Sequence, residues 1–230
     1  MTNTANGGSV VVGTSSEAEN LGVSFGHGNK VIGSNSGGGQ RGLALGNYLT
    51  VKGEEAVAVG TNASATADWA IAMGKNSKAE KETAMAFGYD SHAKVFGGVA
   101  LGSWSVADTA AGVSGYDPST KAASTDTSVA WKSTVAAVSV GDASKGITRQ
   151  ITNVAAGAAD TDAVNVAQLK KAVAGAADGN DTLVSGSNGL SLSGKTLSMS
   201  VKDTAGNEVK GSVDLSSVAD GNDKLVSDNN

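Results

Sequence analysis

The sequence has 230 residues, of which 32 are glycine, one is proline and none is cysteine. It carries 17 basic and 22 acidic residues, so its net charge is −5, and no cluster of arginines marks a nucleic-acid surface. The lack of cysteine excludes disulfides, thiol nucleophiles and cysteine-based metal sites. Aromatic residues, which dominate core energetics, make up only 4%, so we expect the chain to gain stability by oligomerisation.

The two ends of the sequence predict a piece of a longer protein. Residues 1–7 have neither the basic nor the apolar region of a secretory leader, and no run approaches the roughly 18 apolar residues of a membrane helix. The polar residues 227–230 end abruptly. We expect a fragment, with Met1 added for expression, that does not itself contact the membrane.

A glycine recurs every fourteen residues, and each one closes a phrase in which large apolar residues flank an alanine. Looser versions of the phrase come first, at 10–13 and 22–26. Such a period predicts a stack of similar coils, not a globular domain with one deep cleft. The five regularly spaced glycines are Gly46, Gly60, Gly74, Gly88 and Gly102.

The alternation within each phrase predicts a short strand with one bulky and one small apolar face. A strand that is apolar on both faces is buried on both. We expect the bulky residues to form the core of the roll: Val57, Val59, Ile71, Met73, Met85, Phe87, Val99 and Leu101. We expect the small face to meet another subunit through Ala58, Ala72, Ala86 and Ala100.

Small or apolar residues also stand three and five positions after each glycine, from Leu49 and Val51 to Ser105 and Ala107. This spacing predicts a second strand with one inward face. The glycine between the two strands suits a turn with positive φ. Two short strands and two turns per coil would give a flattened β-roll.

The segment after the coils carries the most specific pattern. It contains DTSVAWKS at 126–133, TRQITNVAAG at 148–157 and DTDAVNVAQLK at 160–170. Together with the fourteen-residue phrases, these strings closely resemble the head end and neck of the YadA-like trimeric autotransporter adhesins. The resemblance covers about residues 8–175.

The resemblance implies a fold and a function. The fold would be an all-β head, a left-handed parallel β-roll that forms a homotrimer, followed by a neck, a short coiled-coil helix and a stalk. The function would be that of a bacterial surface adhesin, without enzyme activity or cofactor. It would attach to host extracellular matrix or cell-surface receptors and promote autoaggregation or biofilm. Anchoring in the outer membrane would come from a C-terminal β-barrel outside this sequence.

The neck and the helix after it should hold the subunits together. Val166, Leu169 and Val173 have the spacing of a coiled-coil seam of about one heptad, with Asp160 or Thr161 as the N-cap. We expect Ile147, Ile151 and Val154 to be buried between chains. The predicted trimer and neck residues are Ile147, Arg149, Gln150, Ile151, Val154, Asp162, Val164, Asn165, Val166, Gln168, Leu169 and Val173.

These features predict four regions: a head over 1–135, a neck over 136–162, a coiled-coil segment over 163–177 and a β-rich stalk module over 178–230. The last module begins a repeat, because the string at 177–185 recurs 42 residues later at 219–227. Alternating runs separated by glycine turns predict short strands within it.

Other interpretations of the residues are weaker. His27 and His92 are the only histidines, and neither has neighbours at metal-ligand spacing, so we predict neither a metal site nor a catalytic one. A left-handed β-helix acyltransferase would need a six-residue period, which the fourteen-residue period contradicts. A purely structural trimeric fibre or spacer would share the coil pattern, and only the neck pattern argues against it. Aromatic residues near the coil turns form a candidate ligand surface: Trp69, Tyr89, Phe96 and Trp104.

Overall fold

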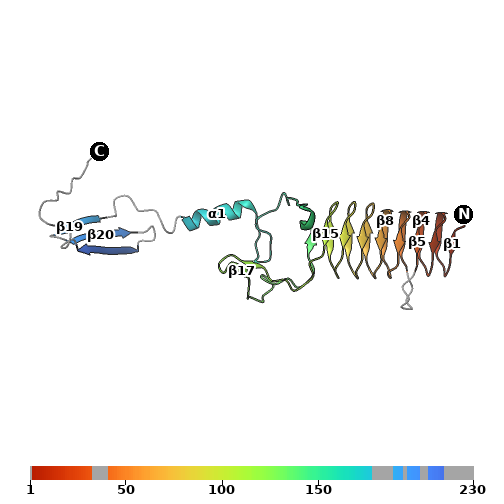
Figure 1. Cartoon of the computed structure of the whole chain (residues 1–230), viewed down its shortest axis with the longest axis horizontal. Helices are drawn as coiled ribbons and strands as arrows, with labels where there is room; N and C mark the ends of the chain where they lie inside the picture. The colour runs from red at the N-terminus through yellow and green to blue at the C-terminus, as the bar shows by residue number, and fades with distance from the viewer. Residues whose placement is uncertain (1, 33–40, 178–188, 194–195, 203–206, 215–230) are drawn as a thin grey trace. The chain divides into compact units, whose positions relative to one another are not determined.

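The computed structural model describes residues 2–32, 41–177, 189–193, 196–202 and 207–214. The chain forms two compact units, Met1–Thr152 and Asn153–Asn230. The first unit is a ladder of flat coils, in which each coil adds one strand to each of two parallel sheets (Figure 1). The prediction of an all-β coil stack is therefore confirmed.

Each sheet has eight strands. Sheet 1 consists of β2 (Val10–Thr14), β4 (Val23–His27), β6 (Leu43–Asn47), β8 (Val57–Thr61), β10 (Ile71–Met73), β12 (Met85–Phe87), β14 (Val99–Leu101) and β18 (Val138–Ser139). Sheet 2 consists of β1 (Thr4–Ala5), β3 (Glu17–Ala18), β5 (Lys30–Val31), β7 (Thr50–Val51), β9 (Ser64–Ala65), β11 (Lys78–Ala79), β13 (His92–Ala93) and β15 (Val106–Ala107).

The glycines form a column that allows successive coils to stack closely. Gly74 has φ of +134°, a conformation that side chains rarely adopt. A Cβ on Gly74 would lie 2.4 Å from the carbonyl oxygen of Gly88, and one on Gly46 would lie 1.8 Å from that of Gly60. Both the conformation and the space therefore require glycine. The repeat thus places identical residues in register, as in the pairing of Ala58 with Ala72.

The interior of the roll is made of small side chains, which corrects the assignment of the two faces of sheet 1. The alanines expected between subunits, Ala58, Ala72, Ala86 and Ala100, are fully buried inside their own coils. The bulky residues expected in the core instead point outward and are partly exposed: Val57, Val59, Ile71, Met73, Met85, Phe87, Val99 and Leu101. The physical reason is volume, because a fourteen-residue coil with two facing sheets has little room between them.

Sheet 2 contributes the other half of this interior, as predicted. The residues three and five positions after each glycine are buried. They are Leu49, Val51, Ala63, Ala65, Ser77, Ala79, Ser91, Ala93, Ser105 and Ala107. Alanine and serine predominate on this side as well, so small residues of one sheet face small residues of the other.

The end of the stack is formed by residues distant in sequence. Strand β14 pairs in parallel with β18, which aligns Val99 with Val138 across 39 positions instead of 14. The intervening chain includes an antiparallel pair, β16 (Tyr116–Asp117) with β17 (Ala122–Ala123). After β18 the chain forms a short 3-10 helix, η1 (Ala143–Lys145). The first part of the neck therefore completes sheet 1.

The second unit contains helix α1 (Val166–Ala177) and a three-stranded antiparallel sheet. Its strands are β19 (Gly189–Ser193), β20 (Thr196–Lys202) and β21 (Glu208–Asp214). The predicted strands of the stalk module are thus present. The repeated strings at 177–185 and 219–227 lie outside the described residues, apart from Ala177. Within the described part of the chain, no helix is long and apolar enough to cross a membrane.

Candidate functional site: an apolar face and the neck

The outward side of sheet 1 carries two continuous columns of apolar side chains, which we call the apolar face. In each strand of sheet 1, one residue points into the roll. Strand pairing aligns the residues that precede these inward residues in one column and the residues that follow them in a second column. The first column is Val10, Val23, Leu43, Val57, Ile71, Met85, Val99 and Val138, and the second is Val12, Phe25, Leu45, Val59, Met73, Phe87 and Leu101.

The apolar face is open in the single chain. Phe25 is 43% exposed, Met73 is 41% exposed and Leu101 is 49% exposed. Soluble monomers rarely expose a contiguous apolar surface of more than a few hundred Å². A face that runs through every strand of an eight-stranded sheet therefore has the character of an interface.

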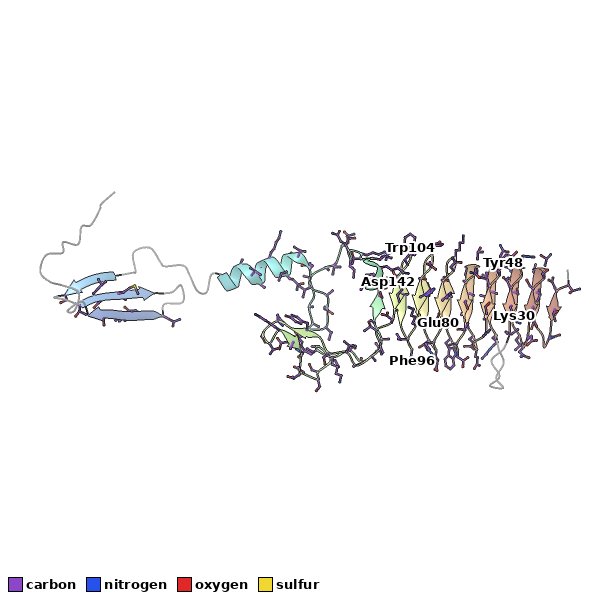
Figure 2. The ribbon with its side chains drawn as sticks, viewed as in Figure 1. Lys30, Tyr48, Glu80, Phe96, Trp104 and Asp142 are labelled. Atoms are coloured by element: carbon purple, nitrogen blue, oxygen red, sulfur yellow. The ribbon has the colours of Figure 1, made fainter. Side chains whose placement is uncertain are left out.

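The outward side of sheet 2 is polar by contrast. Lys78 and Lys94 are exposed there, with the half-buried His92 between them in chain order. Partial burial and then the charge of Lys78 lower the pKa of His92 below its usual value, so the imidazole is mainly neutral at pH 7. One side of the roll thus suits solvent and the other suits a partner. Figure 2 shows the edges between these two sides, with Tyr48 and Trp104 along one edge and Phe96 along the opposite edge.

Arg149 closes the open end of the coil stack. Its guanidinium donates hydrogen bonds to the carbonyl oxygens of Ser103, at 2.5 Å, and of Val140, and to the hydroxyl of Ser105 at 3.1 Å. A Cβ placed on Gly102 would lie 3.1 Å from the guanidinium carbon of Arg149, whereas a Cβ on the earlier glycines would meet the backbone of the next coil. Arg149 thus occupies the place that the next coil takes elsewhere in the stack. Arg149 therefore binds backbone carbonyls that lack a following coil.

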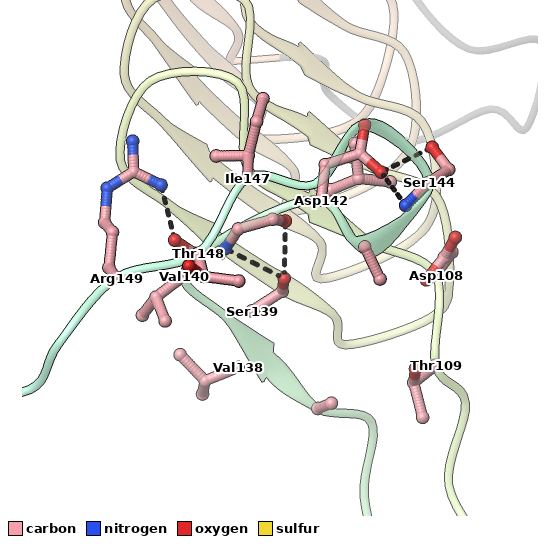
Figure 3. Close-up of a pocket in the computed structure, with 14 residues that line it drawn as sticks. Asp108, Thr109, Val138, Ser139, Val140, Asp142, Ser144, Ile147, Thr148 and Arg149 are labelled. Carbon is pink, nitrogen blue, oxygen red and sulfur yellow. Dashed lines mark hydrogen bonds between the residues drawn. The ribbon is translucent and has the colours of Figure 1, made fainter.

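Beside Arg149, a turn around Asp142 shapes the neck (Figure 3). The Ser144 hydroxyl and amide donate to the Asp142 carboxylate at 2.6 and 3.0 Å. These hydrogen bonds, the hydroxyl first, hold the pKa of Asp142 below its usual range. Asp142 and Ile147 exchange backbone hydrogen bonds at 2.9 Å. The turn borders a hollow of about 520 Å³ between β15, β18 and the Ile147–Arg149 segment.

In the second unit, a reciprocal capping box starts helix α1. The backbone N–H of Gln168 donates to the side-chain oxygen of Asn165 at 3.0 Å, and the backbone N–H of Asn165 donates to the side-chain oxygen of Gln168 at 3.3 Å. The N-cap is therefore Asn165 and not Asp160 or Thr161, and the helix begins at Val166. An Asn-x-x-Gln spacing in the sequence was the available signal for this cap.

The same two side chains fix the segment before the helix. The Gln168 side chain both donates to and accepts from the backbone of Gly157, each at 2.9 Å. Asn165 donates to the Val154 carbonyl at 3.2 Å, and Asp162 accepts from the amides of Ala158 and Ala159 at 2.9 and 3.0 Å. The neck residues Asn165, Gln168 and Asp162 are thus brought together by hydrogen bonds within one chain.

The apolar residues predicted for the neck and helix are not buried by the single chain. Ile147 and Val154 are partly buried, and Gln150 is exposed. The others are 58 to 72% exposed: Ile151, Val164, Val166, Leu169 and Val173. Their burial between chains remains a prediction, and their exposure leaves them available for it.

The four aromatic residues of the candidate ligand surface lie at two different edges of the roll. Tyr89 and Trp104 occupy turns that lead from sheet 1 to sheet 2, and their rings form a T-shaped pair with centroids 5.6 Å apart. Trp69 and Phe96 occupy the turns that lead back to sheet 1 and are 44% and 65% exposed. The structure therefore brings together only Tyr89 and Trp104. Among the described residues, no three histidine or acidic side chains are grouped as a metal would require.

Comparisons with known proteins agree with this architecture. The YadA head domain repeat matches in two copies over residues 52–77, and the coiled stalk of trimeric autotransporter adhesin matches residues 150–191. Autotransporter adhesin BadA of Bartonella henselae is 62% identical over 66 residues, which are 29% of this chain and 2% of BadA. Trimeric autotransporter adhesin AtaA of Acinetobacter sp. strain Tol 5 is 58% identical over 71 residues, again 29% of this chain and 2% of the relative.

The chain spans about one fiftieth of the length of these curated relatives. The family models match two of the stacked coils and the segment that runs from the second part of the neck through helix α1. The chain therefore combines coils similar to the YadA head domain repeat with a segment similar to the coiled stalk of trimeric autotransporter adhesins.

Proposed function

We propose that this segment belongs to a bacterial surface adhesin that attaches to host extracellular matrix or to cell-surface receptors. The head-repeat and stalk matches and the two adhesin relatives support this proposal. In this role the protein acts by binding, not by catalysis, and is held at the outer membrane by parts outside this segment. Autoaggregation and biofilm formation are further activities of the same display at the cell surface.

We infer that the working form is a homotrimer and that the apolar face is buried between its subunits. The observation that carries this inference is the outward position of the bulky apolar residues. A stable interface needs about 800 Å² from each partner, and two columns of large side chains along eight strands can supply a surface of that size. The exposed stripe of Val166, Leu169 and Val173 would continue the association along α1.

The neck would connect these two modes of association. Arg149 secures the end of the coil stack, while Gln168 and Asn165 secure the start of the helix. A helix of 12 residues is marginal on its own in water, so its stability must come from such contacts and from neighbouring helices. Leu169→Asp should therefore weaken the trimer, which would be measured as a lower melting temperature and a smaller mass in solution.

The adhesive role is tested by binding of the purified segment to an immobilised panel of matrix proteins and receptor ectodomains. We expect saturable binding to at least one member by the trimer, and loss of binding by the variant Met73→Asp, because three linked heads gain avidity that one head lacks. Lys78→Asp, on the polar side of the same coil stack, is the matched control that keeps the trimer. Absence of binding by a folded trimer would favour a structural spacer instead.

A further inference from the structure

One corner of the coil stack combines an unusual backbone with exposed aromatic rings. The second residue after each of the five repeat glycines has positive φ, between 53° and 61°. These residues, which we call the corner residues, are Tyr48, Asn62, Asn76, Asp90 and Trp104. Asparagine and aspartate tolerate this conformation, whereas a bulky side chain there is an outlier. Tyr48 and Trp104 therefore depart from the residue type that the fold favours.

Burial within the chain does not explain these two aromatic residues. Tyr48 is 57% exposed and Trp104 is 46% exposed. Among the described residues, each has one ring partner in the preceding coil, His27 for Tyr48 and Tyr89 for Trp104, in T-shaped pairs with centroids 5.1 and 5.6 Å apart. A T-shaped pair uses the edge of one ring, so ring faces stay open to solvent. Strained and exposed residues of this kind point to a binding function.

The side chains between the two aromatic pairs are polar or charged. The coils of Asn62 and Asn76 lie between them, and the side-chain amide of Asn62 donates to the side-chain carbonyl oxygen of Asn76 at 3.0 Å. The remaining residues of this row are Thr61, Lys75 and Asp90. The positive charge of Lys75 and the negative charge of Asp90 balance each other. With coils about 4.8 Å apart, the row from Tyr48 to Trp104 is roughly 19 Å long. It offers ring faces at its ends and hydroxyl, amide and charged hydrogen-bonding groups along its length.

We propose that this corner binds a neutral oligosaccharide. The C–H face of a sugar ring packs on an open aromatic face, and its hydroxyl groups suit a row of amide, hydroxyl and carboxylate side chains. Balanced charges along the row favour a neutral sugar over a polyanion. A proline-rich peptide would require a groove between neighbouring aromatic rings, whereas these pairs lie four coils apart. The proposal rests on the adhesive function and names the chemistry of one ligand.

Substitutions taken from the repeat itself test the proposal without disturbing the coil. Trp104→Asn installs the residue of Asn62 and Asn76 at the same corner, and Tyr89→Thr installs that of Thr61. Thr83→Asn is the matched control, because Thr83 has a similar positive φ, 56°, in a turn at the opposite edge and is not part of the candidate ligand surface. The probes are immobilised neutral tetrasaccharides of glucose and of N-acetylglucosamine, a sulfated tetrasaccharide and a proline-rich peptide.

We expect the unmodified segment and Thr83→Asn to bind a neutral tetrasaccharide equally. Trp104→Asn and Tyr89→Thr should each weaken binding by about tenfold or more, as expected for loss of one stacking contact. Three results would overturn the proposal: failure to bind any neutral sugar, binding only to the sulfated sugar or the peptide, or binding by Trp104→Asn and Tyr89→Thr as strong as that of the unmodified segment. If the segment still adhered to matrix proteins, the adhesive function would stand while the sugar assignment failed.

Discussion

Gly74→Ala is the substitution that tests the stacking of the coils most sharply. The φ of +134° is a region used almost only by glycine, and holding another residue there costs about 1–3 kcal/mol. The new Cβ would also lie 2.4 and 2.6 Å from the carbonyl oxygen and carbon of Gly88. These are backbone atoms, so relief requires the coils to move apart, at a further cost of about 1–3 kcal/mol. We expect a total destabilisation of about 4 kcal/mol.

Gly146→Ala provides the control for conformation alone. Gly146 has φ of +67°, but nothing lies within 4 Å of a Cβ placed there. Its replacement should cost about 1–2 kcal/mol. For a chain of this size each kcal/mol lowers the melting temperature by roughly 2–4 °C, so Gly74→Ala should melt at least about 4 °C below Gly146→Ala. Thermal unfolding followed by circular dichroism, at one protomer concentration, measures both. Equal melting temperatures would refute the close stacking of the glycine column.

Three further predictions concern the core, the neck and acid stability. Ala72→Leu should destabilise the roll by about 1–3 kcal/mol because Ala72 is fully buried between sheets of small residues, while Met73→Leu, on the outward side, should be nearly neutral in chemical denaturation; equal effects would contradict the corrected faces. Gln168→Ala removes the bonds to Gly157 and should reduce the helical signal on mild heating, whereas Lys171→Ala on the exposed side of α1 should not. Because the pKa of Asp142 is lowered in the folded state, its contribution to stability is present above its unfolded pKa and is lost as pH falls below about 4, so Asp142→Asn should show a shallower loss of melting temperature on acidification than the unmodified chain.

The period of the sequence predicted the coil, because glycine at one register position has a single explanation in backbone geometry. The inward side of sheet 2 also followed from it, since Ala65, Ala79 and Ala93 repeat at the same spacing. The two sides of sheet 1 were exchanged because bulky apolar residues were assumed to form the core. That assumption holds for a protein that folds as a monomer and buries its large apolar residues within one chain. It fails here, because the single chain leaves Phe87 partly exposed on the outer side of sheet 1.

The details of the neck were less accessible to sequence reasoning. Val99 pairs with Val138 because the chain leaves the coil stack after β15 and returns to it 39 residues after Val99, and the fourteen-residue period does not predict this return. Arg149 was assigned to the neck by resemblance, but its bonds to Ser103 and Val140 depend on where the coil stack ends. The positive φ of Trp104, by contrast, could have been inferred from its alignment with Asn62 and Asn76, since asparagine in a turn is a signal for that conformation.

The association of the apolar face is the central claim, and the mass of the segment in solution tests it most directly. The measurement is native mass spectrometry or light scattering on the unmodified chain and on Phe87→Asp, with Lys94→Asp as the control on sheet 2. We predict three times the monomer mass for the unmodified chain and for Lys94→Asp, and a shift towards the monomer for Phe87→Asp. A well-folded monomer for the unmodified chain, or an intact trimer for Phe87→Asp, would contradict the claim.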